Sequence, residues 1–195
     1  MARPSNKQQR TEQILDAFEW CVSKYGVEGS TLEKIAEKAK LARPLIRHHI
    51  GNKELLLGSL VDRMITKSAC SMKQLIDSLP STDVGSKLIE YLFDPDYSDQ
   101  QMILVFGGLI LAATDRPQLA ETMSHWVTQF IETITQLLKQ EFPNSDNSIL
   151  SAVATGITGI YFNVDSLSAL NQTTTIRSDS KAAAFMLLKA LKQSG

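Results

Sequence analysis

The stretch that decides the fold is Ser30–Leu57, STLEKIAEKAKLARPLIRHHIGNKELLL. Residues 31–39 carry apolar side chains at helical spacing, and Thr31 is a suitable N-cap for that helix. The spacing breaks over residues 40–42, and Pro44 fits the first turn of a second short helix, where its missing N–H costs nothing. Two short helices joined by a tight turn predict a helix-turn-helix, whose second helix enters the major groove of DNA.

The second of these helices is expected to have one apolar side and one basic side. Ile46 and Ile50 are four residues apart and predict the buried side. The other positions carry cations or imidazoles, namely Arg43, Arg47, His48 and His49. A basic side next to a groove-binding motif favours contact with nucleic acid. The alternative interpretation is a solvated helix face that binds nothing.

The segment of about residues 10–64 resembles the DNA-binding domain of the TetR family of transcriptional regulators. In that family the second motif helix commonly begins near Ser-Arg-Gly or Ser-Arg-Pro, continues through Tyr-Tyr-His-Phe, and is followed by Lys-Glu. This chain matches the pattern at Arg43, Ile46, His49, Lys53 and Glu54. It departs from the pattern at Arg47 and His48, where the family has aromatics, and at Lys40, where the family often has Gly.

The resemblance implies a set of DNA contacts. Arg43, Arg47 and His48 are the expected base readers, since arginine can bond bidentately to O6 and N7 of guanine. Thr31, His49 and Lys53 are expected on backbone phosphates, which position a protein without reading sequence. The full set of predicted DNA-binding residues is Thr31, Arg43, Pro44, Leu45, Arg47, His48, His49 and Lys53.

Charge is distributed unevenly along the 195 residues. Residues 1–54 carry ten Lys or Arg against seven acids, and residues 55–195 carry ten against fourteen, which gives +3 and −4 and sums to the overall −1. A mildly basic N-terminal part fits a surface that meets phosphate. Arg3, Lys7 and Arg10 are expected on an arm before the first helix, which either contacts DNA or is an ordinary frayed terminus.

The remaining pattern predicts an all-α protein of about nine helices. The expected organisation is an N-terminal three-helix DNA-binding domain at residues 8–54, with the motif at about 31–50, followed by a helical effector-binding and dimerisation domain at residues 55–195. A helix at residues 53–79 joins the two and is either a lever or a long core helix. The apolar segment 101–113 is expected to be buried on several sides.

The last two helices, expected at about residues 146–170 and 181–193, are apolar on two sides. A helix with two apolar sides needs two neighbours, and a second copy related by a two-fold axis would supply one. The TetR resemblance likewise implies a four-helix dimer interface there, and the layout of residues 94–113 and 152–180 is most similar to choline-responsive repressors. The predicted interface residues are Ile157, Ile160, Val164, Phe185 and Leu188.

Aromatic side chains in the helical body are the candidates for a ligand pocket. They are Phe106, Trp126, Phe130 and Tyr161. Rings of this kind wall many small-molecule sites, but they are more often plain core. No pattern of charge specifies a ligand, so the effector remains unknown.

Other classes of protein are disfavoured by the composition. A hydrophobic content of 43% without a long apolar run argues against a membrane protein, and no secretory signal is expected, so the predicted location is the cytoplasm. Adjacent His48 and His49 point about 100° apart on a helix and cannot share a metal. No enzyme, metal or cofactor is therefore expected.

The predicted function is transcription regulation by a homodimeric, DNA-binding, TetR-like regulator. A repressor that a small-molecule ligand releases from operator DNA is expected more often than an activator in such a family. The alternative is an effector-independent or architectural DNA-binding protein. A ligand found in the helical body would separate the two.

Overall fold

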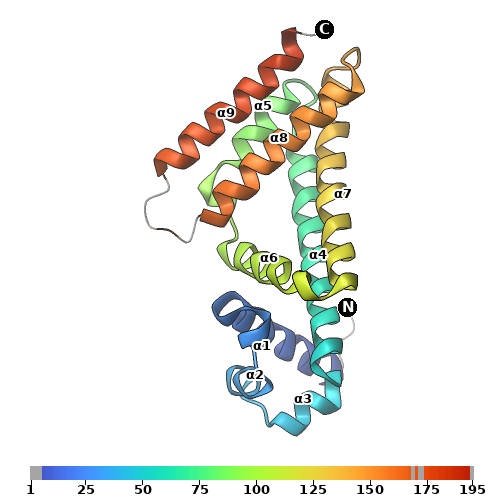
Figure 1. Ribbon diagram of the computed structural model, residues 1–195, viewed down its shortest axis with the longest axis vertical. Helices are drawn as coiled ribbons and strands as arrows, with labels where there is room; N and C mark the ends of the chain where they lie inside the picture. The colour runs from blue at the N-terminus through green and yellow to red at the C-terminus, as the bar shows by residue number, and fades with distance from the viewer. Residues whose placement is uncertain (1–5, 168–169, 171–173, 194–195) are drawn as a thin grey trace. The chain divides into compact units, whose positions relative to one another are not determined.

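Helices form throughout the chain, as the sequence predicts. The computed structural model describes residues 6–167, 170 and 174–193 (Figure 1). Within these ranges it contains nine α-helices, two short 3-10 helices and no strand. None of these helices is both long enough and apolar enough to cross a bilayer. The α-helices are α1 (Asn6–Gly29), α2 (Leu32–Ala39), α3 (Arg43–Ile50), α4 (Lys53–Ser78), α5 (Val84–Leu92), α6 (Gln100–Ala112), α7 (Pro117–Glu141), α8 (Asn147–Ser166) and α9 (Thr174–Gln193).

The helices group into two units. The first unit comprises residues 1–69 and 101–123, and the second comprises residues 70–100 and 124–195. The first therefore contains the predicted DNA-binding helices α1, α2 and α3 together with α6 and parts of α4 and α7. The functional boundary expected between residues 54 and 55 is a different division and stays a prediction.

The predicted helix-turn-helix is formed by α2 and α3, which contact each other and α1 (Figure 1). The hydroxyl of Thr31 accepts a hydrogen bond from the backbone N–H of Lys34 and caps α2. Lys40 ends this helix in the left-handed conformation, with φ 54°. The backbone N–H of Leu41 then donates to the carbonyl of Ala36 over 2.9 Å, which completes the turn. Pro44 lies in the first turn of α3, as expected.

The first helix begins earlier than predicted. Lys7 and Arg10 were expected on an arm before it, but α1 starts at Asn6, so both residues lie on the helix. Arg3 lies outside the described residues. Near its other end α1 is interrupted at Gly26, whose φ of 68° is readily adopted only by glycine. Helices α1 and α6 meet closely at this point. If Gly108 of α6 carried a Cβ, that atom would lie only 3.8 Å from the Cα of Gly26.

A buried acid joins three helices of the first unit. Glu19 on α1 is only 5% exposed. Its carboxylate accepts two hydrogen bonds of 2.7 Å from the Nζ of Lys67 on α4 and one of 3.2 Å from the Nε2 of Gln101 on α6. The Nε of Arg63 lies 3.5 Å from the same carboxylate. A buried charge needs such partners, because its hydration is lost.

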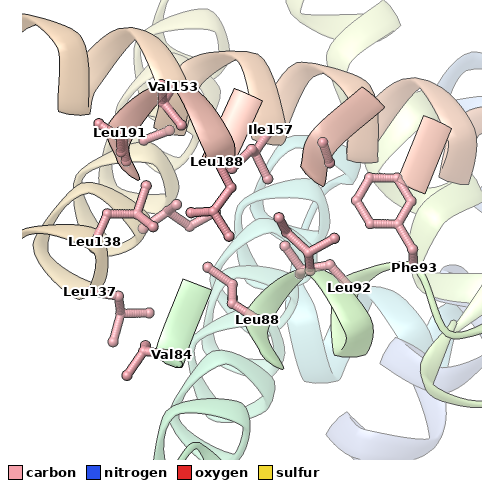
Figure 2. Close-up of a cluster of buried hydrophobic side chains, with 14 of the residues drawn as sticks. Val84, Leu88, Leu92, Phe93, Leu137, Leu138, Val153, Ile157, Leu188 and Leu191 are labelled. Carbon is pink, nitrogen blue, oxygen red and sulfur yellow. The ribbon is translucent and has the colours of Figure 1, made fainter. Parts of the chain in front are cut away.

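The core of the second unit is built from apolar side chains of five helices (Figure 2). These helices are the C-terminal part of α4, which contributes Leu75, together with α5, α7, α8 and α9. Figure 1 shows α8 and α9 running side by side. Figure 2 labels Val84, Leu88, Leu92, Phe93, Leu137, Leu138, Val153, Ile157, Leu188 and Leu191 in this cluster.

Two expectations about the helical body are wrong. The last helix starts at Thr174, seven residues before the expected Lys181, although its first turns are rich in Thr, Ser and Asp, which are poor helix formers. An ion pair between Arg177 and Asp165 of α8 supports this early start. The other concerns α6, which was expected to be buried on several sides: its buried residues Val105, Leu109 and Ala112 lie on one side, and Ile110 and Leu111 are 50% and 72% exposed.

The left-handed residue in the motif turn gives a first testable prediction. Lys40→Gly removes the steric cost of a side chain at φ 54° and should raise the free energy of unfolding by about 0.5–1 kcal/mol, measured by urea denaturation. The matched control is Glu37→Gly in the same helix, where glycine should lower it by up to about 1 kcal/mol. Destabilisation of similar size by both variants would show that the turn carries no strain.

Candidate nucleic-acid interface

The orientation of α3 is fixed by its apolar side. Ile46 is 1% exposed and Ile50 is half-buried, and the helix contacts both α1 and α2. Because successive residues of a helix point about 100° apart, burial of Ile46 turns its neighbours away from the core. The side chains exposed on this helix are Arg43, Pro44, Arg47 and His48, while Leu45 and His49 are half-buried.

The predicted base-reading arginines differ in their surroundings. A guanidinium nitrogen of Arg43 lies 2.6 Å from the carboxylate of Glu33, and both side chains are exposed. Arg47 is exposed, and its guanidinium has no ion pair or hydrogen bond within the described residues. Arg47 is therefore free to take a ligand at once, whereas Arg43 has to exchange Glu33 for it.

Lys53, a predicted phosphate contact at the start of α4, is also partnered. Its Nζ lies 3.7 Å from a carboxylate oxygen of Glu28 and 3.4 Å from the backbone oxygen of the same residue. A hydrogen bond from Arg116 lowers the pKa of the Glu28 carboxyl, so this acid stays ionised beside Lys53. Glu28 is exposed and Lys53 is half-buried, so solvent weakens the pair and a phosphate can compete for the lysine.

Thr31 is exposed, and its hydroxyl has two partners within the chain. As N-cap, the oxygen accepts a hydrogen bond from the backbone N–H of Lys34, and the O–H donates to the Glu33 carboxylate. A phosphate would have to replace Glu33 as the acceptor. Beside it, the Nζ of Lys34 donates to the carbonyl of Gly29 over 2.9 Å and lies 4.0 Å from the centre of the Tyr25 ring. Our sequence analysis did not assign Lys34 to the site. The sequence signal that could have identified Lys34 is its place one turn after the N-cap residue Thr31.

The two histidines of α3 lie beside a shallow cavity of the first unit. Their ring centres are 5.3 Å apart, in an edge-to-face arrangement. The cavity has a volume of about 460 Å³ and is lined by Lys7, Arg10, Leu45, His48 and His49. The sequence analysis treated Lys7 and Arg10 separately from α3, and the fold brings the two groups together. Among the described residues, no three His, Cys, Asp or Glu side chains are placed to hold a metal ion.

The residues predicted to form a dimer interface are mostly part of the core. Ile157, Val164 and Leu188 are no more than 2% exposed within the chain itself, so the expectation that they contact a partner is wrong. They pack in the core of the second unit, where α8 meets α9 and α5. Ile160 and Phe185 are half-buried and retain some accessible surface.

The predicted pocket aromatics do not form one group. Phe106 belongs to the first unit, and the other three belong to the second. Trp126, Phe130 and Tyr161 pack with Phe162, which sequence reasoning missed. Trp126 stacks on Phe162 with ring centres 5.4 Å apart, and Phe130 stacks on Tyr161 at 6.1 Å. A role of this aromatic cluster as a pocket lining stays a prediction.

A polar group that the sequence did not reveal adjoins the aromatic cluster. Asp165 of α8 is 4% exposed and lies 3.3 Å from a guanidinium nitrogen of Arg177 on α9. Burial raises the pKa of the Asp165 carboxyl, and this effect outweighs the hydrogen bond from Tyr161 and the charge of Arg177. Burial also raises the pKa of the Tyr161 phenol far above its ordinary value, so the phenol stays protonated.

Comparison with known proteins identifies the fold. No protein-family model matches the sequence, and neither does any curated protein sequence. Solved structures do match. A TetR-family transcriptional regulator from Cytophaga hutchinsonii superimposes with a TM-score of 0.78 over 97% of this chain and 98% of its own, at 13% identity. This chain has the fold of TetR-family regulators.

Two further solved structures have the same fold. A TetR-like transcriptional regulator from Rhodococcus sp. RHA1 gives a TM-score of 0.68 over 96% of this chain and 99% of its own, at 15% identity. The multidrug binding protein EbrR, solved with imidazole, gives 0.63 over 95% and 96%, at 19% identity. The TetR fold makes α2 and α3 the expected helix-turn-helix. The likeness to choline-responsive repressors stays a prediction.

The buried acid of α8 gives a second testable prediction. A carboxyl whose folded pKa lies above its ordinary 3.8 binds a proton in the folded state that the unfolded state has already released. The stability that it contributes therefore falls as the pH rises through that window. Asparagine does not titrate, so Asp165→Asn lacks this dependence. The difference in unfolding free energy, native protein minus Asp165→Asn, should therefore fall as the pH is raised from roughly 4 to 7.

Urea denaturation of both proteins across this range measures the difference. Asp83→Asn, on an exposed loop of the same unit, is the control. A difference that grows with pH would contradict the prediction, since it would mean that Arg177 holds the pKa of Asp165 below its ordinary value.

Proposed function

We propose that the protein is a homodimeric, DNA-binding transcriptional regulator of the TetR type. The observation that carries this proposal is the exposed basic side of α3, in which Arg47 has no partner within the described residues, on a helix anchored by buried Ile46. The fold supports it, since the solved structures that this chain resembles include TetR-family transcriptional regulators. A regulator, rather than an enzyme, is the function that this arrangement favours.

Within this proposal the DNA contacts divide into two kinds. Arg47 and, after release from Glu33, Arg43 read base edges in the major groove, because guanidinium groups match O6 and N7 of guanine. Thr31, His49 and Lys53 hold the phosphate backbone on either side, and Pro44 and Leu45 shape the start of α3. Backbone contacts of this kind fix register without selecting sequence.

We also propose that two copies associate through α8 and α9. Two recognition helices bind two half-sites, and this requires a dimer. The accessible surface of this helix pair is rich in small and apolar residues, unlike an ordinary solvated surface. Met186 is 68% exposed, and Ala152 and Gly159 are exposed on α8. Ile160 and Phe185 lie at the edges of this surface, and the buried residues of the same helices support it from within.

A small-molecule effector that releases operator DNA completes the proposal. The structure of EbrR, a multidrug binding protein, contains imidazole, so a protein of the same fold binds a small molecule. In this chain the aromatic cluster of the second unit is the favoured location. A coupling of about 1–3 kcal/mol between effector and DNA changes DNA affinity roughly 5- to 150-fold. We place the protein in the cytoplasm, where operator DNA is found.

The alternative is a DNA-binding protein without an effector. The dense ring packing between Trp126, Phe130, Tyr161 and Phe162 favours it, because a filled core leaves no space for a ligand. A thermal-shift screen of small molecules, followed by titration of each hit with and without operator, separates the two. Linkage requires a releasing effector to bind more weakly in the presence of operator.

The base-reading role of Arg47 gives the third prediction. Arg47→Ala should weaken binding to the cognate operator by about 1–3 kcal/mol and leave binding to random duplex nearly unchanged, because it removes a base contact. Fluorescence anisotropy with both duplexes measures the difference. Lys24→Ala, an exposed lysine on α1, is the control. An equal loss on operator and random DNA would assign Arg47 to the backbone.

The dimer surface gives the fourth prediction. A Cβ at Gly159 meets no atom within 4 Å, so Gly159→Glu should leave the single chain folded. In a dimer across α8 it places a carboxylate in a dry interface, and the protein should become monomeric by light scattering and lose operator affinity steeply. Gly107→Glu on α6 is equally unhindered and serves as the control. A Gly159→Glu dimer with native affinity would disprove this interface.

A further inference from the structure

The cavity between α1 and α3 has a lining of one chemical kind. Its four polar side chains are Lys7 and Arg10 from the first turns of α1 and His48 and His49 from α3, and its fifth lining residue is Leu45. No acidic side chain lines it. The ammonium of Lys7 and the guanidinium of Arg10 repel each other and gain from a shared anion, and each imidazole can add an N–H donor. An ordinary solvated helix face instead carries both signs of charge.

The two cations of this cavity, Lys7 and Arg10, have no acidic partner within the described residues and can bind an anion. Arg10 uses one Nη for a 2.7 Å hydrogen bond to the side-chain oxygen of Gln13, which is neutral and leaves the charge uncompensated. Lys7 is exposed and has no ion pair within the described part of the chain. Arg43 and Lys53, by contrast, each have an acidic partner. The cavity therefore holds cations that need no exchange before they take an anion.

His49 has one ring nitrogen that can meet a ligand. Its Nδ1 is buried and has no hydrogen-bond partner among the described residues. A proton on Nδ1 would lack an acceptor in that position, so the neutral ring is better accommodated with its proton on Nε2. An Nε2–H group is a donor, which suits an anionic oxygen. His48 lies next to it, with ring centres 5.3 Å apart, and its ring is exposed.

We propose that Lys7, Arg10, His48 and His49 form a seat for one backbone phosphate of duplex DNA. The inference rests on the proposed function and adds a contact from α1, which the sequence analysis left between a DNA-contacting arm and a frayed end. A phosphodiester oxygen accepts hydrogen bonds from ammonium, guanidinium and imidazole groups alike. The seat adjoins α3, so a backbone held there flanks the groove that Arg47 reads.

The proposal changes the role of one residue. His48 was expected to read bases together with Arg43 and Arg47. As a wall of the phosphate seat it contacts the backbone instead, and sequence selection falls to the two arginines. The contact from α1 would fix how deeply α3 enters the groove, since the phosphate is held from two helices of the same unit.

The first experiment measures the salt dependence of binding to a random-sequence duplex. The double variant Lys7→Gln/Arg10→Gln should lower the slope of log K against log salt concentration by about one unit, the effect of one phosphate contact, and weaken binding roughly five- to ten-fold at 0.1 M salt. The control Lys24→Gln/Lys73→Gln removes the same charge from two exposed lysines that do not line the cavity, and its slope should stay at the native value. Thermal melts check that both proteins are folded.

A second experiment locates the contact on the DNA. Single phosphates of a selected operator are replaced by neutral methylphosphonates, one position at a time. In the native protein, methylphosphonate at one position per half-site should lower the affinity. In the double variant the same replacement should have little effect, because the side chains that contact this phosphate are already absent. His49→Phe, which keeps an aromatic ring but has no N–H donor, should become less sensitive at that same phosphate.

The outcomes separate the seat from the proposed function. Suppose that the native protein binds duplex DNA and that the double variant has the same salt slope and the same methylphosphonate pattern. This result would overturn the phosphate seat and leave the proposed DNA binding intact. A native protein that binds no duplex at low salt would overturn both. Loss of slope in the double variant alone, with the surface control unchanged, is the result that the proposal predicts.

Discussion

Burial of Ile46 is the constraint on which the candidate DNA surface depends. The helix that carries it, α3, has eight residues and is too short to be stable alone, so its orientation comes from packing on α1 and α2. With Ile46 held at 1% exposure, Arg47 is turned to solvent and His49 is half-buried beside the cavity that Lys7 and Arg10 also line. A polar residue at position 46 would weaken this packing. The basic side chains of α3 would then lose their common orientation, even though none of them is changed.

The cations of this surface fall into two groups, those paired with an acidic side chain and those without such a partner. Arg43 and Lys53 are held by Glu33 and Glu28, and these exposed acids keep the free surface from being strongly basic. Such pairs contribute little to stability, so DNA can replace the acids at small cost. Arg47 and Lys7 have no acid of their own within the described residues. A modest net charge therefore coexists with a local surface that suits a polyanion.

Local signals in the sequence predicted the motif, because an N-cap at Thr31, Pro44 in a first turn and one apolar side are properties of single helices. Long-range packing was not accessible in the same way. Helical spacing showed that Ile157 and Leu188 are apolar but not whether they meet their own chain or a partner, and the structure places both in the core. The pair of Asp165 and Arg177, and the approach of Arg10 to His49, likewise join residues distant in sequence.

The central claim is that α3 reads DNA as part of a two-fold symmetric regulator, and selection from random duplexes tests it most directly. The native protein is mixed with a library of random-sequence DNA, and bound duplexes are recovered and sequenced over several rounds. The account predicts one enriched sequence with two inverted half-sites about one helical turn, or a multiple of it, apart. Recovery of unrelated sequences with no inverted repeat, at an affinity no greater than that for the starting library, would contradict it.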